Sequence, residues 1–300
     1  MIDIFLIIFG LIIGSFLTVC IYRIPYGREK GIGDYDPDED KPEHCYKGGE
    51  GDTEEKITIC NPRRSFCPNC KTQLKWYHNI PFFSWLFLRG RCAFCHERIS
   101  FRYPLVELIS AFLCWLSFYT IADYPTAALV YIFCCTLVVI SFIDIDYYII
   151  PNVISIPMIL FGGLIVIFNH TYKYIVGHPF FTFPVLQNVW GSFWGLLAGA
   201  GVLLFVSKLF LVLRKKEGLG FGDIKLLAMV GILFGPSAAL YTIMVGSCFG
   251  AVFGILQLCL QGKKMGYPLS FGPYLSLATI LYFFLDPAID PFRQVFYFLQ

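Results

Sequence analysis

Charged residues are scarce in this sequence of 300 residues. They make up 15% of the chain, and the formal net charge is only +2. A chain so close to neutral offers no basic surface for nucleic acid, so nucleic acid is excluded as a partner. The N-terminus also lacks the basic region and the small-residue cleavage site of a secretory signal, and Asp3 stands near its start. We therefore expect residues 2–22 to be a retained membrane span.

Hydrophobic residues, in contrast, make up 57% of the chain. This composition predicts an all-α polytopic membrane protein in which residues 104–300 form the main transmembrane domain. The apolar runs fall at residues 2–22, 104–122, 126–143, 153–169, 187–213, 224–260 and 269–285. The run 224–260 is too long for one span and is interrupted at Gly235-Pro236, so we expect it to supply two spans. The total is then about eight transmembrane helices.

Glycine recurs at every fourth position in three of these runs. The positions are Gly10/Gly14, Gly191/Gly195/Gly199 and Gly246/Gly250/Gly254. This spacing lets the backbones of membrane helices approach closely, so we expect helix packing at these positions.

Lysine and arginine are almost confined to one side of the membrane when eight spans are assumed. The connecting segments on that side are residues 23–103, 144–152, 214–223 and 261–268. The other side holds only Lys173 and Arg293. Because positive residues accumulate on the cytoplasmic side, both termini are expected outside and the long loop inside.

Two acidic motifs lie at this cytoplasmic edge. Asp144 and Asp146 end one apolar run, and Asp223, in the motif Gly220-Phe221-Gly222-Asp223, opens another. A carboxylate at membrane depth is costly without a partner, so these residues are functional candidates. The two glycines allow a sharp turn and the close approach of another segment. We expect an acid/base pair in which only one of Asp144 and Asp146 faces Asp223, because residues two apart on a helix point to different faces.

Four cysteines of the long loop form two Cys-x-x-Cys pairs separated by 21 residues. This pattern predicts a structural Zn²⁺ site with four thiolate ligands in a module at residues 65–98, formed by Cys67, Cys70, Cys92 and Cys95. Disulfide bonds are the alternative, which a cytoplasmic location disfavours. His78 and His96 flank the cysteines, but four thiolates already complete the metal, so we do not expect them to be ligands.

The acidic insertion, residues 27–60, has almost no aliphatic side chains, and we interpret it as a solvated segment. Cys45 and Cys60 lie in it without a partner at ligand spacing and are interpreted as free thiols. The other six cysteines lie in apolar runs and are interpreted as small buried hydrophobic side chains: Cys20, Cys114, Cys134, Cys135, Cys248 and Cys259.

Several short motifs follow one another along the chain. They are Gly14-Ser15-Phe16-Leu17 with Tyr22-Arg23-Ile24-Pro25, the two Cys-x-x-Cys pairs, Asn79-Ile80-Pro81 with Ser84-Trp85, Arg102-Tyr103-Pro104-Leu105-Val106-Glu107-Leu108, Asp144-x6-Pro151-Asn152 and Gly220-x-Gly222-Asp223-x-Lys225-Leu226. Taken together and in this order, they resemble the bacterial type IV prepilin peptidases, which are membrane aspartic proteases that also N-methylate the trimmed pilin. The resemblance covers most of residues 10–275. It departs at the acidic insertion, which is longer than the family's usual link.

The resemblance implies an endopeptidase of the bacterial inner membrane that cleaves the basic leader of prepilins and pseudopilins after glycine. It selects Asp144, rather than Asp146, as the catalytic partner of Asp223. It also implies N-methylation of the new N-terminus, with S-adenosyl-L-methionine as methyl donor and Glu107 as a candidate for methyl transfer or for binding the substrate amine. The residues leave a second interpretation of Glu107 open, an ion pair with Arg102 or another interfacial arginine.

Two other charged residues receive simpler interpretations. Asp146 is interpreted as an interfacial charge in contact with water. Lys225 is interpreted as an anchor on the positive side of the membrane rather than as a catalyst.

A membrane transporter is the main alternative, because intramembrane carboxylates also mark proton relays. A relay would spread ionisable groups through the membrane, whereas these aspartates share one edge and a zinc module accompanies them. A zinc-stabilised scaffold without catalysis is a third interpretation, but it gives no reason for paired aspartates.

Overall fold

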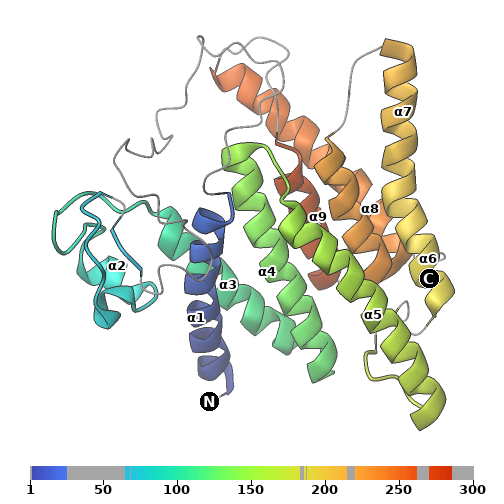
Figure 1. The fold of residues 1–300 in the computed structure, drawn as a ribbon, viewed down its shortest axis with the longest axis horizontal. Helices are drawn as coiled ribbons and strands as arrows, with labels where there is room; N and C mark the ends of the chain where they lie inside the picture. Colours follow the sequence, from blue (N-terminus) through green and yellow to red (C-terminus); the bar gives the residue numbers. More distant parts are fainter. Residues whose placement is uncertain are drawn as a thin grey trace, which may run out of the picture.

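The computed structural model describes residues 2–25, 65–67, 69–182, 186, 188–214, 220–261 and 270–285. Over these residues the fold is helical, and strand pairing is confined to two isolated bridges in the long loop (Figure 1). The elements are α1 (Ile2–Arg23), η1 (Trp76–Asn79), α2 (Phe83–Phe87), α3 (Arg102–Thr120), α4 (Tyr124–Tyr147), α5 (Asn152–Val176), α6 (Val189–Leu196), the π-helical η3 (Leu197–Gly201), α7 (Val202–Arg214), α8 (Phe221–Gln261) and α9 (Gly272–Phe284). The expected all-α class is confirmed.

Some expectations lie outside the described residues. They are the solvated insertion 27–60 with Cys45 and Cys60, the basic residues Lys215, Lys216, Lys263 and Lys264, the side chain of Cys259, and Arg293. Four of the cysteines expected in the interior are buried, Cys20, Cys114, Cys134 and Cys135, but Cys248 is exposed on the surface of its helix.

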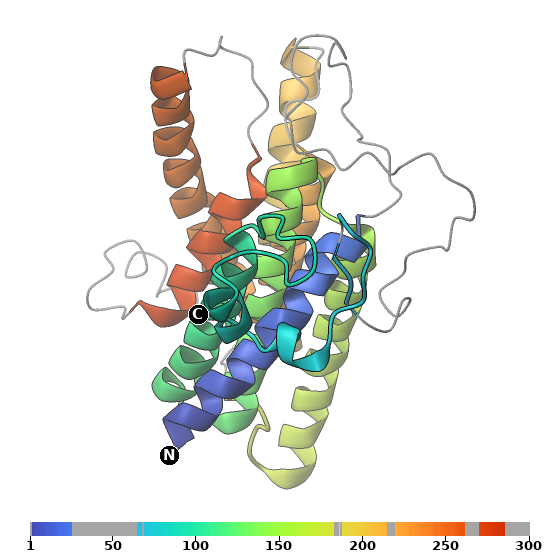
Figure 2. The ribbon, with the colours of Figure 1, turned by 90° about the vertical axis from the view of Figure 1, so that its left-hand side faces the viewer.

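Helix α4 forms the centre of the bundle. Its side chains Phe133, Leu137 and Ile140 have no exposed surface. The ring of Phe133 packs edge-on against Phe234 of α8 and Phe283 of α9, with ring centroids 5.0 and 6.1 Å apart. Figures 1 and 2 show the pair α1 and α3 on one side of α4 and α5 on the other. The core therefore lies around α4, α8 and α9.

Glycine contacts set how closely the helices pack. A Cβ atom placed at Gly10 would lie 2.5 Å from Cα of Ala111, and one at Gly14 would lie 2.5 Å from Cα of Glu107. A Cβ atom placed at Gly195 would lie 2.0 Å from the carbonyl oxygen of Gly231. No larger residue fits at these contacts, so glycine-mediated packing, expected from the spacing, is present between α1 and α3 and between α6 and α8.

Helix α8 folds back on itself. Gly235 interrupts it with φ 84° and ψ −176°, at the place where the sequence predicts a break. Leu227 and Ala239 stand on either side of this break, yet both lie within 3.4 Å of a Cβ placed at Gly199. Twelve residues of a straight helix would separate them by about 18 Å. The chain therefore reverses at Gly235, and the two arms, residues 221–234 and 236–261, approach each other near this break.

Helix length and apolar composition identify the candidate membrane spans. Six helices in the part of the chain that the structure describes are long and apolar enough to cross a membrane: α1, α3, α4, α5, the α6–α7 helix and α8. Helix α9 is apolar but has only 13 residues. The expected total of eight counts α9 and both arms of α8, and it stays a prediction.

The ends of two helices differ from the expected boundaries. The apolar run at 126–143 was expected to end before Asp144, but α4 continues to Tyr147 and includes both Asp144 and Asp146 in its last turns. Helix α8 begins at Phe221, so Asp223 lies in its first turn. The acidic residues are thus held on helices instead of on connecting loops.

Candidate functional site

Asp144 is buried at the end of α4 and is held by the start of α9. Its Oδ2 atom accepts a hydrogen bond from Oγ of Ser270 at 2.7 Å and another from the backbone N–H of Gly272 at 3.0 Å. Gly272 is the first residue of α9. The N-terminus of a helix carries unpaired N–H groups and a partial positive charge, so it stabilises a carboxylate. These two donors favour the ionised form of Asp144, against the cost of burying a charge.

Asp223 is also buried, in the first turn of α8. The structure brings it close enough to Asp144 for the two carboxyl groups to interact electrostatically. Gly222 makes this approach achievable, because a Cβ there would lie 2.9 Å from Cβ of Ile150, in the segment between α4 and α5. Gly220 lies beside the carboxyl group, where a Cβ would be 3.4 Å from Oδ2 of Asp223. The arrangement places two buried acids at one end of the bundle.

Asp146 points away from this pair. Its Oδ1 atom accepts a hydrogen bond from Nη1 of Arg102 at 2.7 Å, and both side chains are partly exposed. The guanidinium group of Arg102 also lies over the ring of Phe142, 5.3 Å from its centroid. Asp146 is thus an interfacial charge, as expected, but it has an arginine partner as well as contact with solvent.

Glu107 does not pair with Arg102, which pairs with Asp146 instead. An ion pair of Glu107 with another interfacial arginine stays a prediction. It is buried in α3, and its Oε2 atom accepts a hydrogen bond from the backbone N–H of Phe82 at 2.6 Å. On α1, Gly14 packs against the backbone of Glu107, where a Cβ atom would lie 2.5 Å from Cα of Glu107. Glu107 therefore lies where α1, α3 and the segment that leads into α2 meet.

Two residues around the acids escaped the sequence analysis. Ser270 and Gly272 hold Asp144, and their one signal is the Gly-Pro pair, because proline is favoured at the start of a helix, where N–H groups lack partners within the helix. Asn152, which the sequence analysis gave only as part of a motif, accepts a hydrogen bond at its Oδ1 from Nζ of Lys225. Lys225 also lies 5.5 Å from the ring centroid of Phe221. It thereby ties the start of α5 to the start of α8, next to Asp223.

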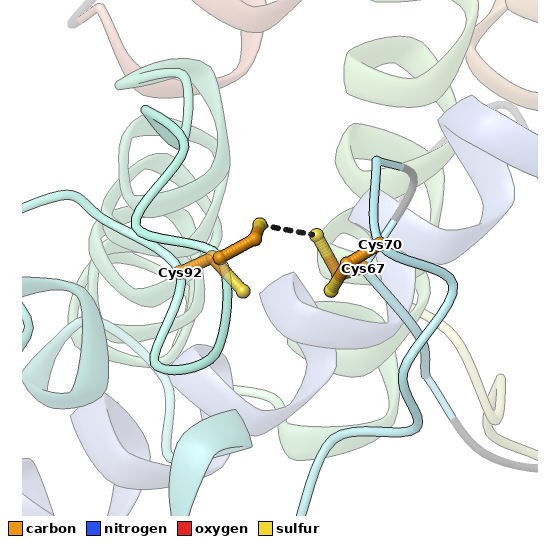
Figure 3. Close-up of side chains that lie close together, drawn as sticks. Cys67, Cys70 and Cys92 are labelled. Carbon is orange, nitrogen blue, oxygen red and sulfur yellow. Dashed lines mark hydrogen bonds between the residues drawn. The ribbon is translucent and has the colours of Figure 1, made fainter.

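The four loop cysteines converge on one point, as Figure 3 shows for Cys67, Cys70 and Cys92. Their sulfur atoms, with that of Cys95, all lie within 4.8 Å of one another, and Cys67 Sγ lies 3.8 Å from Cys95 Sγ. Zinc–sulfur bonds of about 2.3 Å in a tetrahedron give sulfur separations of about 3.8 Å. The cluster fits a tetrahedral Zn²⁺ ion, and none of its sulfur atoms forms a disulfide.

The two Cys-x-x-Cys turns have the same local structure. The N–H of Lys71 donates to the carbonyl of Cys67 at 2.8 Å, and the N–H of His96 donates to the carbonyl of Cys92 at 3.1 Å. Lys71 and His96 both have positive φ, 54° and 57°. Lys71 and His96 thus take equivalent positions, each one residue after the second cysteine of its pair. Two matching turns give the four-ligand geometry that the metal requires.

Protonation of the thiols follows their surroundings. Burial raises the pKa of Cys67 above its ordinary value, and hydrogen bonds with Thr72 lower the pKa of Cys70. A bound cation would favour the thiolate form at all four positions.

The fold and the site define a class: a polytopic membrane protein with two buried aspartates at one end of its bundle and a four-cysteine module beside it. The family model described as the bacterial peptidase A24 N-terminal domain matches residues 8–121. The model described as the type IV leader peptidase family matches residues 131–255. Together with the relatives given next, these matches show that the chain belongs to the type IV leader peptidase family.

Relatives in several bacteria align with most of the chain. A prepilin leader peptidase/N-methyltransferase of Aeromonas salmonicida is 35% identical over 276 residues, which cover 90% of this chain and 86% of the relative. Proteins of the same name in Stutzerimonas stutzeri and Pseudomonas aeruginosa are 33% and 32% identical over 91% of this chain and 86% of each relative. No solved structure matches. These comparisons give no support to the transporter interpretation.

Proposed function

We propose that this protein is an aspartic endopeptidase of the bacterial inner membrane that removes the basic leader from type IV prepilins and pseudopilins, cutting after glycine. The observation that carries the proposal is the pairing of buried Asp144 with buried Asp223. The names of the relatives supply the substrate class. The pairing supplies the chemistry, because two close carboxyl groups in a partly desolvated site favour sharing one proton.

The two aspartates take different roles because their surroundings differ. Asp144 receives hydrogen bonds from Ser270 and Gly272, which favour its ionised form and suit it as the general base. It takes a proton from water, and the oxygen of that water attacks the scissile carbonyl carbon. Asp223, as the protonated member, donates its proton to the developing oxyanion. In the second step, Asp144 returns a proton to the leaving amine, Asp223 takes back a hydroxyl proton from the tetrahedral intermediate, and the peptide bond breaks.

The cytoplasmic edge of the membrane is the proposed place of this reaction. Both aspartates lie where helices end or begin, at the same end of the bundle as Arg102 and Asp146. The folded-back arms of α8 support a topology of eight crossings, which leaves both termini outside and the four-cysteine module inside. A leader that stays in the cytoplasm, joined to an apolar helix in the bilayer, would then bring its cleavage site to this edge.

The four cysteines are proposed to hold a structural Zn²⁺ ion, and S-adenosyl-L-methionine is proposed as a methyl donor. Zinc is supported by the sulfur geometry, and the methyl donor is supported by the names of the relatives. Glu107 is the residue of this chain proposed to serve methyl transfer, because it is a buried carboxylate that touches the loop carrying the metal module. As a carboxylate, it would attract the new, positively charged amine of the trimmed pilin.

Incubation of the reconstituted protein with a synthetic prepilin tests the proposal. Mass spectrometry should show a leader that ends in glycine and a mature segment whose N-terminus carries a methyl group. Intact prepilin after incubation with folded, metal-loaded protein would contradict the peptidase assignment.

A further inference from the structure

The module between α1 and α3 carries a small apolar surface on α2. Phe83, Leu86 and Phe87, which we call the α2 wedge, are 47%, 52% and 80% exposed. Trp85 of the same helix turns the other way, because its Nε1 donates to the carbonyl of Ile99 at 3.1 Å and its ring lies over Gly90. The wedge therefore lies on the outer side of the module, and Trp85 anchors the inner side.

The attachment of the module shows how deep this wedge lies. Phe82, the residue before α2, donates its N–H to Glu107. Glu107 lies five residues after Arg102, which begins α3, and so up to about 7.5 Å along the helix axis from that polar end. On α1 the same glutamate packs against Gly14, which is nine residues, or about 13 Å, before Arg23. Both helices are candidate membrane spans, so Phe82 is held inside their polar ends.

The position of α2 in the figures agrees with this estimate. In both views α2 lies alongside α1 rather than beyond its end (Figures 1 and 2). The outer face of α1 is itself apolar, with Ile12 56% and Phe16 53% exposed. The wedge thus lies at the level of a surface that already faces lipid.

The charges next to the wedge fit a membrane surface. Arg89 and Arg91 follow α2 and are exposed. Interfacial helices combine an apolar face, buried about 5–10 Å into the boundary between headgroups and acyl chains, with cationic residues that attract anionic lipid. Long cationic side chains can reach from such a depth to the headgroups.

We propose that the α2 wedge inserts into the membrane leaflet in which α1 ends and α3 begins. This insertion docks the four-cysteine module on the bilayer. The lipid contact of the wedge holds the turn at Phe82 on its outer side, and the hydrogen bond to Glu107 holds it on the side that faces the helix bundle. That turn needs support, because Phe82 has φ 60° and ψ −52° and the N–H of Phe83 donates to the carbonyl of Pro81 at 2.6 Å, a strained γ-turn. The docking is independent of peptidase activity.

Fluorescence of the full chain in vesicles of phosphatidylethanolamine and phosphatidylglycerol tests the docking. An environment-sensitive fluorescent amino acid replaces Phe87 in one variant and Glu97, an exposed residue of the second cysteine turn, in a matched control. We expect emission at position 87 to be blue-shifted, strongly quenched by lipid-borne nitroxide and weakly quenched by aqueous iodide. Position 97 should show the reverse order, and metal content should confirm that both modules are folded.

Three outcomes of this experiment decide whether the α2 wedge inserts into the bilayer. The proposal is supported if Leu86→Glu, combined with the probe at 87, removes the nitroxide quenching and restores iodide quenching. It is overturned if position 87 responds like position 97 in vesicles. It is also overturned if position 87 leaves water only after a synthetic prepilin is added, because the wedge would then be a substrate surface.

Discussion

The backbone N–H of Gly272 lies 3.0 Å from Oδ2 of Asp144, although 128 positions of the chain separate the two residues. A Cβ atom at position 272 would lie 2.7 Å from the same oxygen. Glycine is therefore required where α9 begins, because any side chain would push the carboxylate away from its two donors. This contact connects the start of the last described helix to the proposed catalytic base.

The Gly272→Ala variant should lose cleavage while keeping its fold. Losing hydrogen bonds to a charged group typically costs about 1.5–3 kcal/mol, which corresponds to roughly a 10- to 100-fold lower rate. Initial rates of prepilin cleavage measure this effect. Gly163→Ala is the control, because a Cβ there would make only an ordinary contact of 3.7 Å with Ile232. Equal rates for the two variants would show that the Gly272 contact does not matter for catalysis.

The ion pair between Arg102 and Asp146 should contribute little to stability. Both side chains are partly exposed, at 44% and 32%, and exposed pairs contribute less than about 1 kcal/mol. A double-mutant cycle with Arg102→Gln and Asp146→Asn, followed by chemical unfolding in detergent, measures the coupling free energy. A coupling of several kcal/mol would mean that the pair is structural.

Removal of the thiolate ligands should unfold the module without abolishing cleavage. In Cys67→Ser/Cys92→Ser protein, we expect metal content to fall from one zinc per chain to none, because metal binding supplies folding free energy to so small a module. Cys248→Ser is the matched control, since that cysteine lies outside the cluster. Plasma emission spectrometry gives the content, and a full complement of zinc in the double variant would point to other ligands.

Glu107→Gln should lower N-methylation more than cleavage. Glutamine can still accept the hydrogen bond from Phe82, but it loses the negative charge that would attract the pilin amine. The mass of the trimmed product reports both activities in one experiment. If both fall to the same extent, Glu107 is a structural residue that holds the turn at Phe82.

Much of this architecture could be predicted from local patterns in the sequence. The break at Gly235, the close contacts at Gly10 and Gly14, and the convergence of two cysteine turns each follow from residue types at short spacing. The pairing of Asp144 with Asp223 was expected because the same side of the membrane gathers both. Such features depend on neighbours in the chain or on the order of spans.

The features that the sequence did not predict depend on contacts between segments that are far apart in the chain. Ser270 and Gly272 lie 126 and 128 positions from Asp144, and no periodicity links them. One open interpretation of Glu107 paired it with Arg102, but residues 102 and 107 are five apart and point to different sides of one helix. The end of α4 was also not predicted, because the apolar run stops at residue 143 whereas the helix continues to Tyr147.

Replacement of each aspartate by asparagine tests the central claim most directly. Cleavage of a synthetic prepilin should be abolished in Asp144→Asn and in Asp223→Asn, with fold and zinc content unchanged, because either change removes one member of the proton-sharing pair. Asp146→Asn should cleave at close to the original rate. Cleavage by both the Asp144 and Asp223 variants would contradict an aspartic mechanism, and loss of activity at Asp146 with activity kept at Asp144 would place the catalytic pair two residues away.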